Sequence, residues 1–247
     1  MSLASLALGV TVFMAGYVLR ARVTPLVMGT HAGFAPFEMR EGGEDSEIVG
    51  FDVEVGRAIA ARAGRPLQIV DLPFEALIPA LESGVVDLLA VAMTITPERA
   101  ERVDFSDPYY RATQVVLMRA GGLMPETKEE LRGRRIGVQA GTTSREAAMA
   151  LTGPENVKEA ATAVAAVGEL QNEGVDYVLM DEQPAVHFAR TDPGLQMVRL
   201  GFEDEFYGVA VRKGNTELLR TVNAALAAIG GDGRYEWFID RWMMQDD

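Results

Sequence analysis

The strongest constraint on the fold is a regular alternation of short apolar runs with stretches of helical periodicity from residue 23 onward. Its first part predicts strands over residues 25–30, 66–72 and 85–93, and helices over residues 51–63 and 74–84. An apolar strand after each helix is typical of α/β folds with mainly parallel sheets. The sequence therefore predicts a β-α-β-α-β unit in this part of the chain.

The same alternation starts again after residues 115–120, beyond a loop rich in glycine, proline and charged residues. We expect strands over 135–141, 175–181 and 208–213, and helices over 144–151, 162–173, 218–229, 235–243 and from Pro184. Residues 84–87 and 174–176 each end a helix and begin a strand, which indicates two lobes of similar construction. A length of 247 residues suits one large or two modest domains.

Residues 3–19 form an uncharged, mostly apolar run that precedes Arg20 and Arg22. The run is long for the core of a signal peptide and at the short limit for a membrane span. Residues 14–17 (MAGY) are similar to a lipoprotein cleavage box, but Tyr17 replaces the cysteine that would be lipidated. We expect a signal or membrane-anchor-like segment over 1–22, which favours export over the alternative of a helix in the folded domain.

Composition excludes several functions. A formal net charge of -13 and a pI near 4.7 argue against nucleic acid as a partner, because such binding needs basic patches. The chain has no cysteine, so it has no disulfide, thiol nucleophile or thiolate metal site. His31 and His187 are too far apart in sequence to suggest a local metal motif. We expect neither a metal nor a cofactor.

Arg99 is the first candidate for a binding residue. Thr96 and Pro97 predict the start of a helix, and this places Arg99 in a first turn that already carries the positive end of the helix dipole. An arginine at the edge of a cleft offers a planar set of donors that fits a carboxylate. The alternative is a solvated arginine paired with Asp104 or Asp107.

Ligands usually bind at the carboxyl ends of strands in open α/β sheets. The candidates at such ends are Ala92, Met93 and Thr94 beside Arg99, then Gln139, Thr142 and Thr143, and finally Asp181. Free amides at the helix start after Gly141 favour an anion, whereas ordinary capping by Thr143 or Ser144 is the alternative. A buried carboxylate at Asp181 suits an ammonium group, whereas helix capping ahead of Pro184 is the alternative.

Aromatic side chains follow the first strand and open the second helix. Phe34 and Phe74 are placed to stack on a ligand, and His31 is placed to reach its far end, although each is more often structural. Together the candidates describe a cleft with an anion clamp and a cation acceptor. A zwitterion fits both.

Six segments carry a resemblance to a known family: GTHAGFAPFEM, IVGFDVEVGRAIA, FEALIPALESGVVDLLAVAMTITPERAERVDFSDPYY, IGVQAGTTS, VDYVLMDEQPA and YGVAVRKGN. They resemble the bacterial extracellular solute-binding proteins, family 3, which serve polar amino-acid ABC importers. The resemblance covers nearly all of the chain from residue 26. It implies a two-lobed, periplasmic-binding-protein-like fold (type II) with two hinge segments, in which residues 23–110 and 208–247 form lobe 1 and residues 111–207 form lobe 2.

The resemblance also implies the roles of the residues that would hold the α-groups of an amino acid. Arg99 would clamp the α-carboxylate, helped by the Thr94 hydroxyl and by the backbone amides of Thr94 and Thr143. Asp181 would take the α-ammonium group together with Thr94 and the carbonyl of Ala92. The sequence has Ala92 where glycine is common in the family.

The same resemblance places Phe34 and Phe74 on either side of the ligand, with His31, Gln139 and Met180 at its side-chain end. His31 stands where an acidic residue is often found, and Met180 is a further departure. An acidic ligand is disfavoured because none of these positions is basic. A neutral, glutamine-like side chain suits them best, and arginine remains open because an amide oxygen and aromatic faces receive a guanidinium.

The expected function is binding of a polar L-amino acid in the periplasm or outside the cell, by a monomer. Hinge closure on the ligand would signal to the membrane permease of an ABC transporter. The alternatives are a cyclohexadienyl dehydratase-like enzyme on the same fold and a tethered sensor domain. We expect no catalytic residue, because the α-amino-acid clamp argues against the enzyme.

Overall fold

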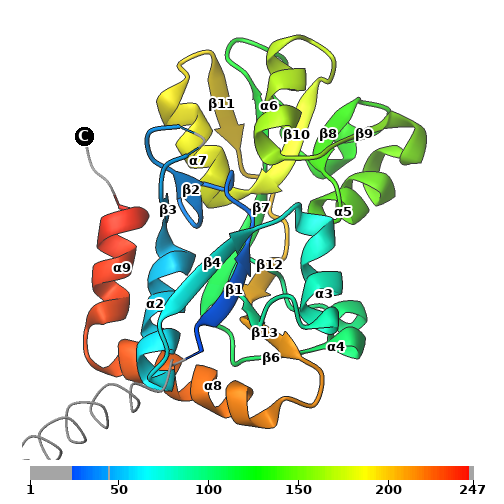
Figure 1. The fold of residues 1–247 in the computed structure, drawn as a ribbon. Coiled ribbons are helices and arrows are strands. Elements are labelled where there is room, and N and C mark those ends of the chain that lie inside the picture. The colour runs from blue at the N-terminus through cyan, green and yellow to red at the C-terminus, as the bar shows by residue number, and fades with distance from the viewer. Residues whose placement is uncertain (1–23, 44, 245–247) are drawn as a thin grey trace, which may run out of the picture.

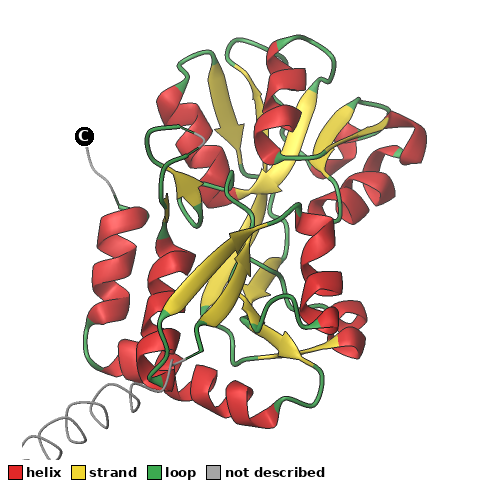
Figure 2. Ribbon diagram, viewed as in Figure 1, coloured by secondary structure: helices red, strands yellow, loops and turns green. Residues whose placement is uncertain are grey.

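The computed structural model describes residues 24–43 and 45–244, so the predicted signal or anchor segment, residues 1–22, lies outside the described residues. The described chain forms two lobes, each built on a sheet with helices on both faces (Figures 1 and 2). This confirms the predicted two-lobed α/β fold. No helix among the described residues combines the length and apolarity needed to cross a membrane.

The sheet of lobe 1 has the strand order β4-β1-β5-β13-β6. β1 is parallel to β4 and β5, whereas β13 is antiparallel to β5 and β6. The strands are β1 (Leu26–Thr30), β4 (Leu67–Asp71), β5 (Leu88–Leu89), β6 (Val103–Phe105) and β13 (Ala210–Arg212), and β2 (Met39–Arg40) and β3 (Ile48–Val49) form a separate pair. The helices are α2 (Phe51–Ala63), α3 (Phe74–Ser83), α4 (Pro97–Arg102), α8 (Thr216–Gly231) and α9 (Arg234–Trp242).

Alternate residues of β1 serve the two faces of this sheet. Leu26 and Met28 are buried in a cluster with residues of α2, α8 and α9, whereas Val27 packs against the cluster that includes α3. This period of two is the geometry of a strand covered on both sides. The C-terminal helices α8 and α9 therefore close lobe 1, next to α2 in Figure 1.

The sheet of lobe 2 has the strand order β11-β7-β10-β8-β9, with parallel pairs on one side of β10 and antiparallel pairs on the other. Its strands are β7 (Tyr110–Arg119), β8 (Ile136–Gln139), β9 (Val157–Ala160), β10 (Tyr177–Asp181) and β11 (Leu195–Val198). Its helices are α5 (Thr143–Thr152), α6 (Ala163–Gln171) and α7 (Glu182–Thr191), with short 3-10 turns at Lys128–Leu131 and Pro154–Asn156. Both sheets are thus mixed.

Two antiparallel strands connect the lobes. β7 leaves lobe 1 and runs into the sheet of lobe 2, and β12 (Asp204–Tyr207) brings the chain back alongside the first half of β7. Their register pairs Tyr207 with Tyr110 and Asp204 with Thr113. The crossing strands place the ligand-binding candidates of both lobes next to one another.

The strand expected over residues 85–93 is much shorter, because only Leu88 and Leu89 belong to β5. The chain turns away at Ala92, whose φ of 45° lies in the left-handed region that a residue with a Cβ seldom occupies. The Ala92 amide donates a hydrogen bond to the buried carboxylate of Asp52 at the start of α2. This contact removes residues 90–94 from the sheet and turns them toward lobe 2.

Candidate functional site

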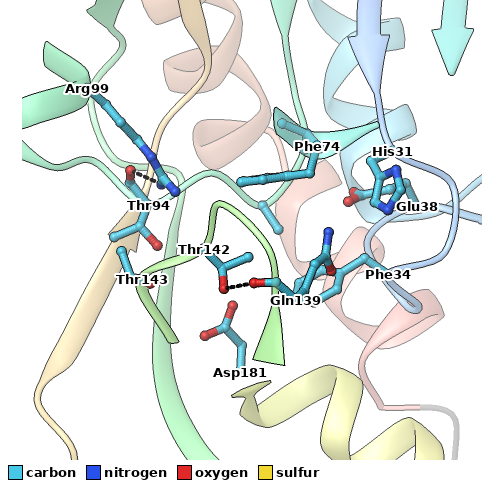
Figure 3. A pocket seen from close by; sticks show the side chains of 12 residues that line it. His31, Phe34, Glu38, Phe74, Thr94, Arg99, Gln139, Thr142, Thr143 and Asp181 are labelled. Atoms are coloured by element: carbon cyan, nitrogen blue, oxygen red, sulfur yellow. Dashed lines mark hydrogen bonds between the residues drawn. The ribbon is translucent and has the colours of Figure 1, made fainter. Parts of the chain in front are cut away.

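A cavity lies between the lobes at the carboxyl ends of their strands. Its lining residues are His31, Phe34, Glu38, Phe74, Val91, Ala92, Thr94 and Arg99 from lobe 1, and Gln139, Thr142, Thr143 and Asp181 from lobe 2. Figure 3 shows Arg99, Thr94 and Thr143 gathered at one end and His31 with Glu38 at the other. Ten of the eleven predicted binding residues therefore come together in the structure.

Met93 and Met180 do not line this cavity. Met93 is buried among the apolar residues of lobe 1 that pack on α3, and Met180 is buried in the core of lobe 2. Ala92 and Thr94 line the ligand cavity, whereas Met93 between them packs into the core.

Arg99 is held by backbone carbonyls of both lobes. Its Nη1 donates to the carbonyl oxygen of Thr94 at 2.8 Å, and its Nη2 donates to that of Gly141 at 3.0 Å. The guanidinium carbon lies 5.5 Å from the centre of the Phe74 ring, within cation–π range. The alternative was a solvated pair with Asp104 or Asp107; among the described residues the hydrogen-bond partners of the Arg99 side chain are the two carbonyls, and Asp104 pairs with Lys213.

Burial lowers the pKa of Arg99, while the nearby carboxylates of Glu146, Glu205 and Asp181 act in the opposite direction. A guanidinium keeps its charge in proteins. Two of its five N–H donors have carbonyl partners, which leaves three for an anion in the cavity. Arg99 is therefore a half-buried cation with unused donors.

The start of α5 faces the same end of the cavity. Thr142 is the N-cap residue, but its hydroxyl donates to the carbonyl oxygen of Gln139 at 2.8 Å and does not cap the helix. The first-turn amides of Thr143 and Ser144 have no intrahelical acceptor. These amides lie at the same end of the cavity as Arg99, at the helix start where the sequence predicts an anion-binding position.

Gly141 allows the lobes to approach here. Its φ is 74°, and a Cβ on it would lie 2.8 Å from Cγ of Glu75 on α3. A side chain at this position would therefore push the start of α5 away from lobe 1. The cavity has a volume of about 20 Å³ for the centre of a water-sized sphere, which is room for about one water molecule.

Asp181 ends β10 and is buried. It occupies the N-cap position of α7 without capping it, because its Oδ2 accepts a hydrogen bond from the Tyr207 hydroxyl at 2.6 Å. Its Oδ1 is buried without a hydrogen-bond partner among the described residues. Burial raises the pKa of Asp181 to about 7, although the bond from Tyr207 and the charge of Arg99 lower it. A cation placed at Oδ1 would remove this desolvation penalty.

The other end of the cavity presents hydrogen-bond acceptors. Nδ1 of His31 lies 3.0 Å from the carbonyl oxygen of Leu72, so Nδ1 carries the hydrogen and a neutral ring leaves a lone pair on Nε2. His31 Nε2, Gln139 Oε1 and Glu38 Oε2 are all buried without a partner among the described residues. Their side chains line the cavity.

Two lining residues, Glu38 and Val91, are missing from the sequence analysis, and Glu38 is the one with a polar side chain. Glu38 lies in the loop between β1 and β2, is 1% exposed, and contacts the buried carboxyl of Asp52. Burial and the neighbouring Asp52 raise the pKa of Glu38 well above its usual value. The available signal was a single acidic residue between Phe37 and Met39, and this pattern does not distinguish a buried carboxyl from an exposed one.

A ligand cavity between two lobes, with two strands that connect them, defines a two-lobed solute-binding protein. The chain belongs to the bacterial extracellular solute-binding proteins, family 3, whose family model matches residues 26–245. The family assignment made from sequence segments is confirmed.

Relatives and a solved structure agree with this assignment. The chain is 34% identical to the arginine-binding extracellular protein ArtP of Bacillus subtilis, over 88% of this chain and 85% of that protein. It is 33% identical to a probable histidine-binding protein of Neisseria gonorrhoeae, over 85% of this chain and 79% of that protein. The structure of an ancestral arginine-binding protein bound to arginine superimposes with a TM-score of 0.84 and 37% identity, over 90% of this chain and 98% of that chain.

Proposed function

We propose that this protein binds a cationic L-α-amino acid, with L-arginine as the first candidate, and delivers it to the permease of an ABC importer. The observation that carries the ligand class is the set of buried acceptors without partners at the side-chain end: His31 Nε2, Glu38 Oε2 and Gln139 Oε1. Acceptors of this kind require a ligand that donates. A guanidinium has five N–H donors and no acceptor.

Glu38 shifts the preference from glutamine to arginine. Without it, the side-chain end has no acid and favours a neutral ligand. Burial and Asp52 favour the protonated form of the Glu38 carboxyl, and a guanidinium placed against it would favour the ionised form and pair with it. The carbonyl of a glutamine side chain would instead add a further acceptor to a set of unpartnered acceptors. Phe34 and Phe74 provide aromatic faces on which a guanidinium stacks. Relatives named for arginine support this choice.

The α-groups of the ligand are held at the other end. Its carboxylate accepts from the remaining donors of Arg99 and from the first-turn amides of α5, and its ammonium donates to Asp181 Oδ1 and the Ala92 carbonyl. Arg99 and Ala92 belong to lobe 1, whereas Thr143 and Asp181 belong to lobe 2. One ligand thereby stabilises the contact of both lobes.

The lobes would separate to admit the ligand, because the cavity is lined from both lobes and Arg99 of lobe 1 contacts the Gly141 carbonyl of lobe 2. We propose that residues 23–110 with 208–247 move as one body against residues 111–207, and that β7 and β12 absorb the change. The permease would then recognise the closed arrangement. The protein would act outside the cytoplasm as a monomer, with residues 1–22 directing export.

The ligand class is tested by titration calorimetry with L-arginine and L-citrulline, which have nearly the same shape but differ in charge. The proposal expects arginine to bind at least about tenfold more tightly than citrulline, and Glu38→Gln to remove most of this preference. Glu41→Gln, at an exposed position directly after β2, is the matched control and should leave it unchanged. Tighter binding of citrulline or glutamine than of arginine by the unmodified protein would overturn the assignment.

We propose no catalytic activity for this site. The relatives are named as binding proteins, and the acceptors at the side-chain end are arranged to hold a cation. The alternative dehydratase activity is measured directly by incubating the protein with prephenate or arogenate. Turnover of either compound would contradict a transport receptor.

A further inference from the structure

A carboxylate on the connecting strand β12 lies between the two lobes. Oε2 of Glu205 accepts hydrogen bonds from the Thr94 hydroxyl of lobe 1 at 2.6 Å and from the Thr143 hydroxyl of lobe 2 at 2.8 Å. Oε1 of Glu205 accepts from Nε2 of Gln114 on β7 at 2.7 Å. Glu205 is therefore surrounded by three donors, and two of them belong to residues that line the ligand cavity.

The direction of each hydroxyl hydrogen bond determines whether Thr94 and Thr143 can donate a hydrogen bond to a ligand or only accept one. A threonine hydroxyl has one proton and two lone pairs. The Thr143 oxygen donates its proton to Glu205 and also accepts from Gln114 Nε2 at 3.1 Å. The Thr94 oxygen donates its proton to Glu205 and keeps its lone pairs. Neither hydroxyl retains a proton for a ligand carboxylate.

This arrangement separates the two roles expected for Thr94. Its hydroxyl cannot help Arg99 bind the α-carboxylate, because it donates its only proton to Glu205. Its oxygen is free to accept a hydrogen bond from an ammonium group, in the cavity that Asp181 with its unpartnered Oδ1 also lines. Glu205, which does not line the cavity, thereby determines that the Thr94 hydroxyl accepts a hydrogen bond inside the cavity and does not donate one.

We propose that Glu205 is a positioning residue. Because it accepts the hydrogen bond of the Thr94 hydroxyl, it leaves the lone pairs of this oxygen to accept a hydrogen bond from the α-ammonium group of the ligand. The inference rests on the proposed function in one respect, that the ligand is an α-amino acid. It does not depend on which side chain the ligand has. The same carboxylate oxygen accepts one hydroxyl from each lobe, so Glu205 also joins the lobes beside the cavity.

The test is a double-mutant cycle on ligand affinity, measured by titration calorimetry. Glu205→Gln keeps the shape but puts an N–H donor in the network, so the threonine hydroxyls are free to turn their protons toward the ligand. Thr94→Val removes the acceptor. The proposal expects Glu205→Gln to weaken binding about 10- to 100-fold alone, and to have little further effect once Thr94→Val is present.

Two more variants separate this role from a structural one. Glu203→Gln removes a nearby charge at an exposed position and should leave the affinity unchanged. Thr94→Ser keeps a hydroxyl and should retain most of the affinity and the full sensitivity to Glu205→Gln. Additive effects of Glu205→Gln and Thr94→Val would overturn the proposal, as would unchanged affinity in Glu205→Gln.

The ligand for the cycle is whichever L-amino acid the unmodified protein binds in a prior thermal-shift screen. If that ligand is not a cationic amino acid, the proposed ligand class fails while the cycle still tests Glu205. If no L-amino acid binds, the proposed function fails and the role of Glu205 fails with it. Melting temperatures of all variants, measured without ligand, show that each is folded before its affinity is interpreted.

Discussion

Replacement of Asp181 by asparagine should stabilise the ligand-free protein and destroy its affinity. Burial raises the pKa of this carboxyl from 3.8 to about 7. A difference of about three pKa units corresponds to about 4 kcal/mol between the two protonation states. At pH 7.5 the unfolded chain has an ionised Asp181, and the folded protein opposes ionisation. The charge therefore lowers the free energy of unfolding by up to about 4 kcal/mol.

Asparagine is neutral at every pH, so Asp181→Asn removes this destabilisation. Its Oδ1 keeps an acceptor for the Tyr207 hydroxyl, and its amide group adds a buried donor without a partner at a cost of about 1–3 kcal/mol. The expected net gain at pH 7.5 is about 1–3 kcal/mol, which raises the melting temperature by about 3–8 °C for a chain of this size. Near pH 4.5 the native carboxyl is protonated in the folded protein, so the gain should vanish.

The assay is a thermal melt of protein stripped of carried-over ligand, at pH 7.5 and pH 4.5. Asp240→Asn, an exposed change on α9, is the control and should shift neither melt. At pH 7.5 the affinity of Asp181→Asn for the amino acid should be at least about 100-fold lower, because an ammonium group loses its buried carboxylate. An equal shift of the melting temperature at both pH values would refute the reasoning about burial.

Three further outcomes follow from the same geometry. Ligand affinity should fall as the pH decreases below about 7, by up to about tenfold per pH unit. The reason is that Asp181 must release a proton before it can pair with an ammonium group. Calorimetry in buffers of different ionisation heat would measure the released proton. Arg99→Ala should abolish detectable binding of every amino acid with little change in melting temperature. Arg102→Ala is the control: it breaks an exposed pair with Glu82 and should leave binding intact. Thr96→Ala should lower the free energy of unfolding by about 1 kcal/mol in a denaturant titration, because the Thr96 hydroxyl accepts the amide hydrogen of Arg99 at 3.2 Å.

The parts of the site that sequence predicts are those made by local structure. Asp181 follows an apolar strand, and Thr143 begins a helix after a glycine turn. The burial of Asp181 follows from its strand being covered on both faces, which apolar periodicity reports. The positions that we propose hold the α-groups can therefore be located from the sequence.

The parts that sequence did not predict are made by contacts between distant segments. Glu38 is buried because the start of α2 and the loop at Ala92 close over it, and no periodicity in residues 31–40 records this. Glu205 lies in a strand with the pattern DEFY, in which an acid beside an aromatic residue suggests an exposed edge. Only the pairing of β12 with β7 brings Glu205 to Thr94 and Thr143.

The two ends of the cavity consequently have different physical origins, and this bears on specificity. At the clamp end, the donors and acceptors belong to strand ends and a helix start, so a change there disturbs the fold as well as the ligand. At the side-chain end, Glu38 is carried by a loop, so a substitution can alter ligand preference without moving a strand. The buried acceptors there are unfavourable for the folded protein until a donor reaches them, since each unpaired group costs about 1–3 kcal/mol. A ligand that supplies these donors recovers that energy on binding, and this is the physical basis of the proposed preference for a cation.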